Sequence, residues 1–143
     1  MDIEAAVREM TDREAIRDLA HRYAHCVWQK DAAGAAALFA EGGVMNTGDR
    51  PPLEGSKAIL EEYRQLFSES TLCPFVHNHV IELSGDRATG NCYLDLRASV
   101  GGVAMTGFGH YDDEYVRIDG RWKFRSRKLN MCQLGEDPAV VDS

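Results

Sequence analysis

Among the residues whose types can carry acid–base chemistry, we single out four side chains: Tyr23, His79, Tyr111 and Asp113. Histidine titrates near neutral pH and can take or give a proton, and a tyrosine hydroxyl can donate a hydrogen bond to a substrate oxygen. Residues two apart in an extended strand share a face, so we expect Tyr111 and Asp113 side by side. We predict that these four residues are catalytic in an acid–base reaction.

Each of these residues also has a structural interpretation. Tyr23 stands on the apolar face of a predicted helix, where it lines a core or a pocket whether or not its hydroxyl meets a substrate. Asp113 can orient a histidine, or it can accept hydrogen bonds from a buried hydroxyl or arginine. His77 and His79 share one face of a predicted strand, where they are either solvated or close to a ligand. We predict His79 as the base or acid and His77 as a binding residue.

Aromatic and thioether side chains elsewhere in the chain predict an apolar binding pocket. Trp28 is broad enough to stack on a flat ring, although packing near a helix end is the simpler interpretation. Phe75 adds a second aromatic group, and Met45 and Met131 are flexible side chains that suit pocket walls. Asn130, near the end of the last predicted strand, can bond a ligand carbonyl or cap the sheet. We predict all five as substrate-binding residues.

Two glycines lie on the same predicted strand face as Tyr111 and Asp113. Gly107 and Gly109 have no side chains, so they leave room above the sheet. A glycine within a strand often marks a site where a ligand approaches the backbone closely. This pattern favours a pocket over that part of the sheet.

Amphipathic helices are predicted before the strands. Thr11 with Glu14 three residues later is a capping-box pattern, which predicts the start of the first helix. A shorter, alanine-rich helix is predicted over 31–40, and a third helix over 56–67. The first and third helices have apolar positions at helical spacing, which predicts one buried face on each.

A four-strand antiparallel meander is predicted over 75–133. Glycine-containing turn signals at 84–86, 100–103 and 118–121 separate runs rich in Val, Ile, Leu, Tyr and Phe. Helices followed by a long meander predict an α+β fold, in which a cone-shaped, curved antiparallel sheet wraps around the N-terminal helices. Such a sheet leaves an internal pocket at its open end.

Length and charge limit the function. The 143 residues predict a single domain, 1–143, with its core at about 10–132. The net charge of −7 and the absence of a Lys/Arg cluster disfavour nucleic-acid binding. No apolar stretch approaches the ~20 residues that span a bilayer, and the acidic N-terminus does not resemble a secretory signal. We therefore expect a cytoplasmic protein with no membrane or nucleic-acid partner.

Nothing in the sequence predicts a metal or a cofactor. The four cysteines are widely spaced and form no CxxC pair, whereas a zinc site needs clustered ligands. No glycine-rich phosphate loop precedes a predicted helix. We expect chemistry that depends on side chains alone.

Several longer stretches resemble the SnoaL-like group. The most specific are GDRA at 85–88, Gly-x-Tyr-x-Asp at 109–113 and DGRWKF at 119–124, and the similarity covers about 10–132. That group includes scytalone dehydratase and belongs to the superfamily of ketosteroid isomerase and nuclear transport factor two. The resemblance implies a cone-shaped α+β barrel with an internal pocket, often dimeric or trimeric, and metal-independent dehydration, isomerisation or other eliminations.

The resemblance also implies which faces point inward. Leu94 and Leu96 are expected to face the pocket and contact the substrate. The alternating residues of the same strand, Tyr93, Asp95 and Arg97, are expected on the outer sheet face. There they are candidates for a homodimer or homotrimer interface.

The catalytic dyad of the resembled dehydratases is not present in its usual places. Those enzymes carry a Tyr on the first helix, an Asp five residues later, and a His near the start of the strand after the third helix. Tyr23 fits the first position, but Trp28 stands in place of the Asp, and Cys-Pro-Phe at 73–75 replaces the His. An enzyme built on this chain needs another base.

We predict a metal-independent lyase or isomerase that performs dehydratase-like elimination, isomerisation or C–C cleavage. Its substrate is expected to be a small, oxygen-bearing hydrophobic compound of aromatic, polyketide-like or steroid-like type. The missing Asp–His dyad leaves open a non-catalytic module that binds small molecules or other proteins. A base in the cavity favours the enzyme, whereas a wholly apolar cavity favours a carrier.

Overall fold

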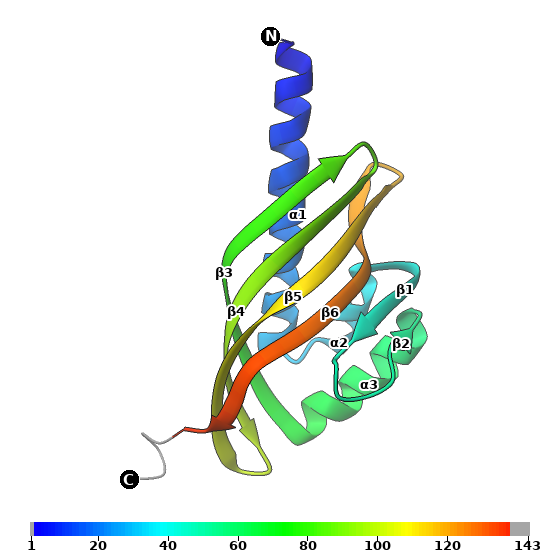
Figure 1. The fold of residues 1–143 in the computed structure, drawn as a ribbon. Helices are drawn as coiled ribbons and strands as arrows, with labels where there is room; N and C mark the ends of the chain where they lie inside the picture. The colour runs from blue at the N-terminus through cyan, green and yellow to red at the C-terminus, as the bar shows by residue number, and fades with distance from the viewer. Residues whose placement is uncertain (1, 138–143) are drawn as a thin grey trace.

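Three helices cover one face of a curved, unclosed sheet of six strands in this computed structural model, which describes residues 2–137 (Figure 1). The elements in chain order are α1 Ile3–Trp28, α2 Ala32–Ala37, β1 Phe39–Asn46, β2 Leu53–Glu54, α3 Ser56–Glu69, β3 Ser70–Ser84, β4 Arg87–Val100, β5 Val103–Ile118 and β6 Arg121–Glu136. The predicted α+β architecture is confirmed.

Helix α1 begins nine residues earlier than the sequence pattern predicts. Asp2 caps it, because the Asp2 carboxylate accepts a hydrogen bond from the Ala5 amide at 3.2 Å. The predicted capping box at Thr11 is wrong. Thr11 lies inside the helix, where its hydroxyl donates to the Val7 carbonyl at 2.8 Å, so its side chain is not available as a cap.

The extra length lets α1 extend past the hairpin ends of the sheet (Figure 1). A buried carboxylate fastens the helix to the sheet. Asp12 accepts hydrogen bonds from Arg117 Nη1 at 2.6 Å and from Trp122 Nε1 at 3.1 Å. Arg117 also pairs with Asp86 at the β3–β4 turn. The C-terminal half of α1, which carries Tyr23, is thereby held over the inner face of the sheet.

The strand order is β2-β1-β6-β5-β4-β3. Strands β3 to β6 form the predicted antiparallel meander. The sheet as a whole is mixed, because β1 pairs with β6 in parallel, with Phe39 opposite Phe124. Phe39 and Phe124 are both buried in the core, along with Ile16 and Ile59 from the helices. The core therefore lies between the helical layer and β1, β6, β5 and β4.

The glycines of β5 do not leave room for a ligand, contrary to the sequence-based expectation. A Cβ atom on Gly107 would lie 2.2 Å from the Gln133 carbonyl oxygen, and one on Gly109 would lie 2.2 Å from the Asn130 carbonyl oxygen. Both obstacles are backbone atoms of β6. The register of β5 against β6 shifts between Phe108 and Gly109. These glycines therefore permit a close approach of two strands at a bulge.

Gly109→Ala is expected to lower the free energy of unfolding by about 1–3 kcal/mol, because the new methyl group forces β6 to move. Urea denaturation at equilibrium measures the change. Gly135→Ala is the matched control, since a Cβ there meets no atom within 4 Å. Equal unfolding free energies of the two variants would show that β6 can move away from the new methyl group without a loss of stability.

Candidate functional site

A cavity of about 80 Å³ lies between α1, α3 and the inner face of the sheet. Three tyrosine side chains contribute to its wall: Tyr23, Tyr63 and Tyr111. The remaining wall is apolar except for Thr47. Its other members are Val27, Met45, Leu66, Phe67, Leu72, Pro74, Leu94, Leu96 and Leu129.

The three phenols are buried hydrogen-bond donors. Tyr23 and Tyr63 share a hydrogen bond between their hydroxyls, and Tyr23 Oη lies 4.0 Å from Met45 Sδ. Tyr111 Oη has no hydrogen-bond partner among residues 2–137. Burial raises the pKa of Tyr23, Tyr63 and Tyr111 well above the ordinary tyrosine value. All three hydroxyls are therefore protonated at neutral pH and can donate to a ligand oxygen.

A fully buried arginine lies behind two of these rings. Arg127 Cζ is 3.6 Å from the centroid of the Tyr111 ring and 4.5 Å from that of Tyr23. Burial lowers the pKa of Arg127, but its neighbours, Asp113 first among them, outweigh burial and raise it overall. The cavity is thus backed by a permanent positive charge.

Asp113 is the counter-ion of this arginine. Arg127 Nε donates to Asp113 Oδ1 at 2.9 Å, and Nη2 donates to Oδ2 at 3.2 Å. The Tyr115 hydroxyl donates to Asp113 Oδ2 at 2.7 Å. Of the two interpretations that the sequence allowed for Asp113, the structure shows the acceptor for a buried arginine and a hydroxyl.

The two strand histidines lie on opposite faces, and the prediction that they share a face is wrong. The pairing of β3 with β4 shifts between Val76 and His79, which reverses the alternation of side chains. His77 is exposed and its Nε2 lies 2.7 Å from Asp95 Oδ2. His79 points inward, with Nε2 2.8 Å from Tyr115 Oη. His79 contacts this internal network and does not line the cavity.

Two buried side-chain nitrogens have no hydrogen-bond partner within the described part of the chain: His79 Nδ1 and Arg127 Nη1. Buried polar atoms in native proteins are nearly always paired, so each exception calls for an explanation, such as strain, a catalytic role or a bound water. Both atoms belong to the same network, which runs from Arg127 through Asp113 and Tyr115 to His79.

Trp28 and Phe75 form an exposed aromatic pair, with ring centroids 5.4 Å apart and nearly perpendicular planes. The Trp28 indole N–H donates to the Pro74 carbonyl at 2.7 Å. The sequence resemblance put Trp28 in place of the Asp of the dehydratases and the 73–75 stretch in place of their His. In this structure an indole–carbonyl hydrogen bond joins these two segments.

Asn130 and Met131 lie outside the cavity wall. Asn130 is opposite His110 in the sheet, and the side chain of His110 is on the outer face. The Asn130 side chain donates from Nδ2 to Asp112 Oδ2 at 2.9 Å. Met131 is opposite Gly109, beside the bulge of β5.

The structure brings Tyr23, Met45, Leu94, Leu96 and Tyr111 together around the cavity. Trp28, Phe75 and His77 lie at the surface, and His79 and Asp113 belong to the buried network.

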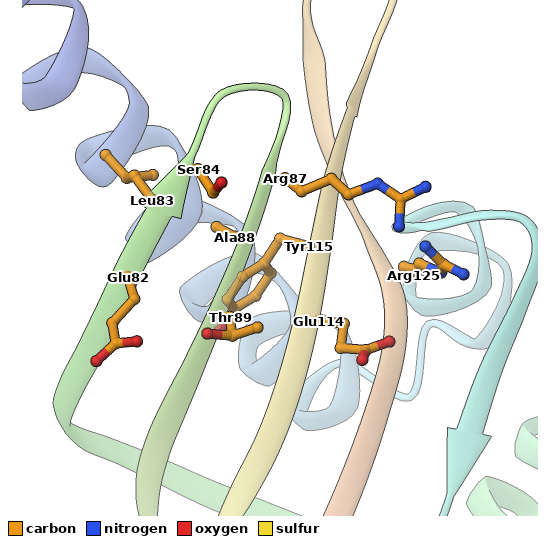
Figure 2. Close-up of a pocket in the computed structure, with 9 residues that line it drawn as sticks. All are labelled: Glu82, Leu83, Ser84, Arg87, Ala88, Thr89, Glu114, Tyr115 and Arg125. Atoms are coloured by element: carbon orange, nitrogen blue, oxygen red, sulfur yellow. The ribbon is translucent and has the colours of Figure 1, made fainter.

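A larger hollow of about 280 Å³ lies over strands β3 to β6. Figure 2 shows Glu82 at one side of it and Arg87 and Arg125 at the other, with Tyr115 between them. The charged side chains are exposed. Because water screens exposed charges, this hollow offers a ligand weaker interactions than the internal cavity does.

The described residues offer few candidates for a metal site or a nucleophilic side chain. No group of three or more His, Cys, Asp or Glu side chains within residues 2–137 is placed to hold a metal ion. Burial raises the pKa of Cys92 to about 11, so its thiol stays protonated at neutral pH. No helix in the described range is both long and apolar enough to cross a bilayer.

The pKa of His79 predicts how stability depends on pH. Burial lowers it to about 4 from the ordinary 6.5. Between these values the unfolded chain binds the proton and the folded chain does not, so the stability contribution is complete above pH 6.5 and is lost as the pH falls toward 4. Urea unfolding of wild type and His79→Gln between pH 7.5 and 4.5 should show a steeper loss in wild type. Parallel curves would contradict the prediction.

Solved structures share this fold. A hexachlorocyclohexane dehydrochlorinase (LinA) type 2 has a TM-score of 0.86 and 18% identity, covering 92% of this chain and 93% of that one. A presumed scytalone dehydratase from Novosphingobium aromaticivorans DSM 12444 has a TM-score of 0.83 and 19% identity, covering 90% and 89%. An NTF2-like protein with a cystatin-like fold from Novosphingobium aromaticivorans has a TM-score of 0.79 and 23% identity, covering 97% and 93%.

No curated protein matches the sequence. The sequence profile of the SnoaL-like domain, however, matches residues 8–128, which include all three cavity tyrosines and the Arg127–His79 network. The chain belongs to the SnoaL-like domain family.

Proposed function

We propose that this protein is a lyase or isomerase that acts on a small, mostly apolar compound with one carbonyl or hydroxyl oxygen. The substrate binds in the internal cavity with its oxygen against the tyrosine hydroxyls. The reaction removes a proton next to that oxygen-bearing group, and the product forms by elimination or isomerisation. The cavity volume of about 80 Å³ favours a compound of one ring or smaller over a polyketide or steroid.

The observation that carries this proposal is that tyrosine hydroxyl donors, with the buried Arg127–Asp113 ion pair behind them, line an otherwise apolar cavity. When Tyr23 donates to Tyr63, the Tyr63 hydroxyl proton is free for a ligand; when Tyr63 donates to Tyr23, the Tyr23 proton points to Met45 Sδ. Tyr111 has a hydroxyl proton of its own. The guanidinium of Arg127 adds a fixed charge behind Tyr111 and Tyr23. Donors that are already in place in a dry site stabilise negative charge as it develops in a transition state. The arrangement therefore suits a reaction that passes through an enolate or a departing oxygen anion.

Ligand binding tests the location of the site. Small aromatic ketones and phenols are expected to raise the melting temperature of wild type, because a ligand that binds only the folded state adds RT ln(1 + [L]/Kd) to its stability. Leu96→Phe places a larger group in the wall and should abolish the shift. Val80→Phe is the control, since Val80 is an exposed residue on β3. If the ligand still raises the melting temperature of Leu96→Phe, the ligand does not bind in this cavity and the proposed location is wrong.

Binding without turnover is the second candidate function. It is favoured by the cavity wall itself, in which no carboxylate or imidazole appears among the described residues. The indole–carbonyl bond between Trp28 and Pro74 also joins the two segments that the sequence resemblance put in place of the base. Nuclear magnetic resonance of bound ligands over time separates the candidates, because an enzyme converts a ligand and a carrier returns it unchanged.

A further inference from the structure

We propose that the ligand of the internal cavity carries an aliphatic tail, and that this tail binds on an apolar shelf next to the cavity. The shelf consists of Ala98, Val100, Val103, Met105 and Leu134. The inference rests on the proposed function, because it assigns a substrate class to the same site. The expected ligand is a small ring with one oxygen-bearing group and an alkyl chain.

The shelf lies on the same face of the sheet as the cavity wall. Leu96 of β4 lines the cavity. The pairing of β4 with β5 has no register shift, so side chains alternate regularly along β4. Ala98 and Val100 therefore share the face of Leu96. Met105 is opposite Ala98, which places it on this face as well.

The shelf extends across three strands. Val103 is opposite Val100 at the two-residue turn that joins β4 to β5. In the row that contains Leu96, Gly107 is the partner on β5 and Leu134 is the partner of Gly107 on β6. The cavity wall is thus continuous with the shelf along β4 and across the sheet. In Figure 1 this turn lies at the end of the sheet that is farthest from the N-terminus of α1.

The shelf is exposed although it is apolar. Val100 is 48% exposed, Val103 is 43% exposed and Leu134 is 50% exposed. Exposed apolar side chains that adjoin one another in a soluble protein mark binding sites. The polar side chains Ser70 and Glu136 share this face only at its ends, where β3 begins and β6 ends. An aliphatic chain suits the shelf because it needs no hydrogen-bond partner.

The sizes of the two regions favour one ligand that spans both. Pockets for small molecules usually measure about 300–1,000 Å³, so a cavity of about 80 Å³ holds only part of a typical ligand. A stable interface with another protein needs roughly 20–30 residues from each side, far more than the shelf provides. The occupant that fits is the part of the ligand that leaves the cavity.

A series of alkyl phenyl ketones tests the shelf. Acetophenone, butyrophenone and hexanophenone share the ring and the carbonyl and differ in the length of the alkyl chain. Calorimetric titration of the wild-type chain should show that Kd falls about twofold to fourfold for each added methylene, as partial or full burial of that group predicts. Equal Kd values for the three ketones would overturn the proposal.

Substitutions on the shelf locate the tail. The double variant Val103→Ser with Leu134→Ser should weaken hexanophenone binding at least fivefold and leave acetophenone binding unchanged. Val80→Ser is the matched control, because Val80 is an exposed valine on β3, and it should leave the binding of both ketones unchanged. Wild-type affinity for hexanophenone in the double variant would overturn the proposal. So would a lower mass than wild type in sedimentation, because a second copy of the chain would then cover the shelf.

Blocking the cavity separates this inference from the proposed function. Leu96→Phe should abolish the binding of all three ketones, because the ring of each lies in the cavity. Acetophenone binding that depends on Leu96, without any effect of chain length, would overturn the shelf and leave the proposed function standing. Failure of all three ketones to bind would overturn both.

Hexanophenone binding that is lost in the shelf variant but kept in Leu96→Phe would also overturn the inference. The shelf would then bind apolar chains independently of the cavity.

Discussion

Replacing Arg127 with methionine is expected to lower the free energy of unfolding by about 3–5 kcal/mol, because it leaves Asp113 charged and buried without its partner. The guanidinium is fully buried, donates twice to Asp113 and packs on the rings of Tyr111 and Phe124. Methionine fills much of the same volume but provides neither the charge nor the donors. Urea or thermal unfolding at pH 7 measures the loss.

Two further variants show that the effect comes from the buried charge. Arg125→Met changes an exposed arginine two residues away and should alter stability by less than about 0.5 kcal/mol. The double variant Arg127→Met with Asp113→Leu removes both charges and should recover much of the loss, as apolar replacements of buried pairs often do. A stable Arg127→Met protein would show that Asp113 takes up a proton or reaches water at little cost.

Tyr111→Phe is expected to lower turnover about 100-fold while leaving the fold nearly as stable as wild type, because an oxyanion donor typically contributes that much. Phenylalanine keeps the ring that packs on Arg127, and the lost hydroxyl has no partner in the described chain. The change therefore removes a donor to the substrate and little else. Kinetics on a ligand that wild type converts, together with urea unfolding, measure the two effects.

Tyr93→Phe provides the comparison for this experiment. Tyr93 is partly exposed on the outer face, so loss of its hydroxyl should leave both rate and stability unchanged. If Tyr111→Phe retains the wild-type rate, Tyr111 has no part in the chemistry. If it binds ligand less tightly and no variant shows turnover, the carrier function is the better description.

The fold follows from local signals that the sequence states directly. Glycine turns at 84–86, 100–103 and 118–121 separate the strands, and the apolar face of α3 is visible in its spacing. Such patterns depend only on residues close together in the sequence, so turns and helix faces can be predicted without the tertiary structure. The parallel pairing of β1 with β6 joins segments about 80 residues apart and has no comparable local signal.

The site was harder to predict because β-bulges change which face a side chain occupies. Trp122 and Phe124 point inward, and side chains alternate between the two faces of a regular strand. Regular alternation would therefore place Ser126 inward and Arg127 outward. The shift in β5–β6 pairing between Glu114 and Tyr115 leaves Arg125 without a register partner and turns Arg127 inward. A similar shift separates His77 from His79. In sequence, Arg127 sits among other basic residues and resembles a solvated surface charge.

The indole–carbonyl bond at Pro74 also bears on the solubility of the protein. Strand β3 ends the sheet on one side, and a terminal strand is a template on which another chain can add a strand. Pro74 has no N–H to offer such a chain, and Trp28 already occupies its carbonyl. This part of the sheet boundary is thus closed to intermolecular pairing, so Trp28→Phe, which frees that carbonyl, should make the protein more prone to self-association on storage.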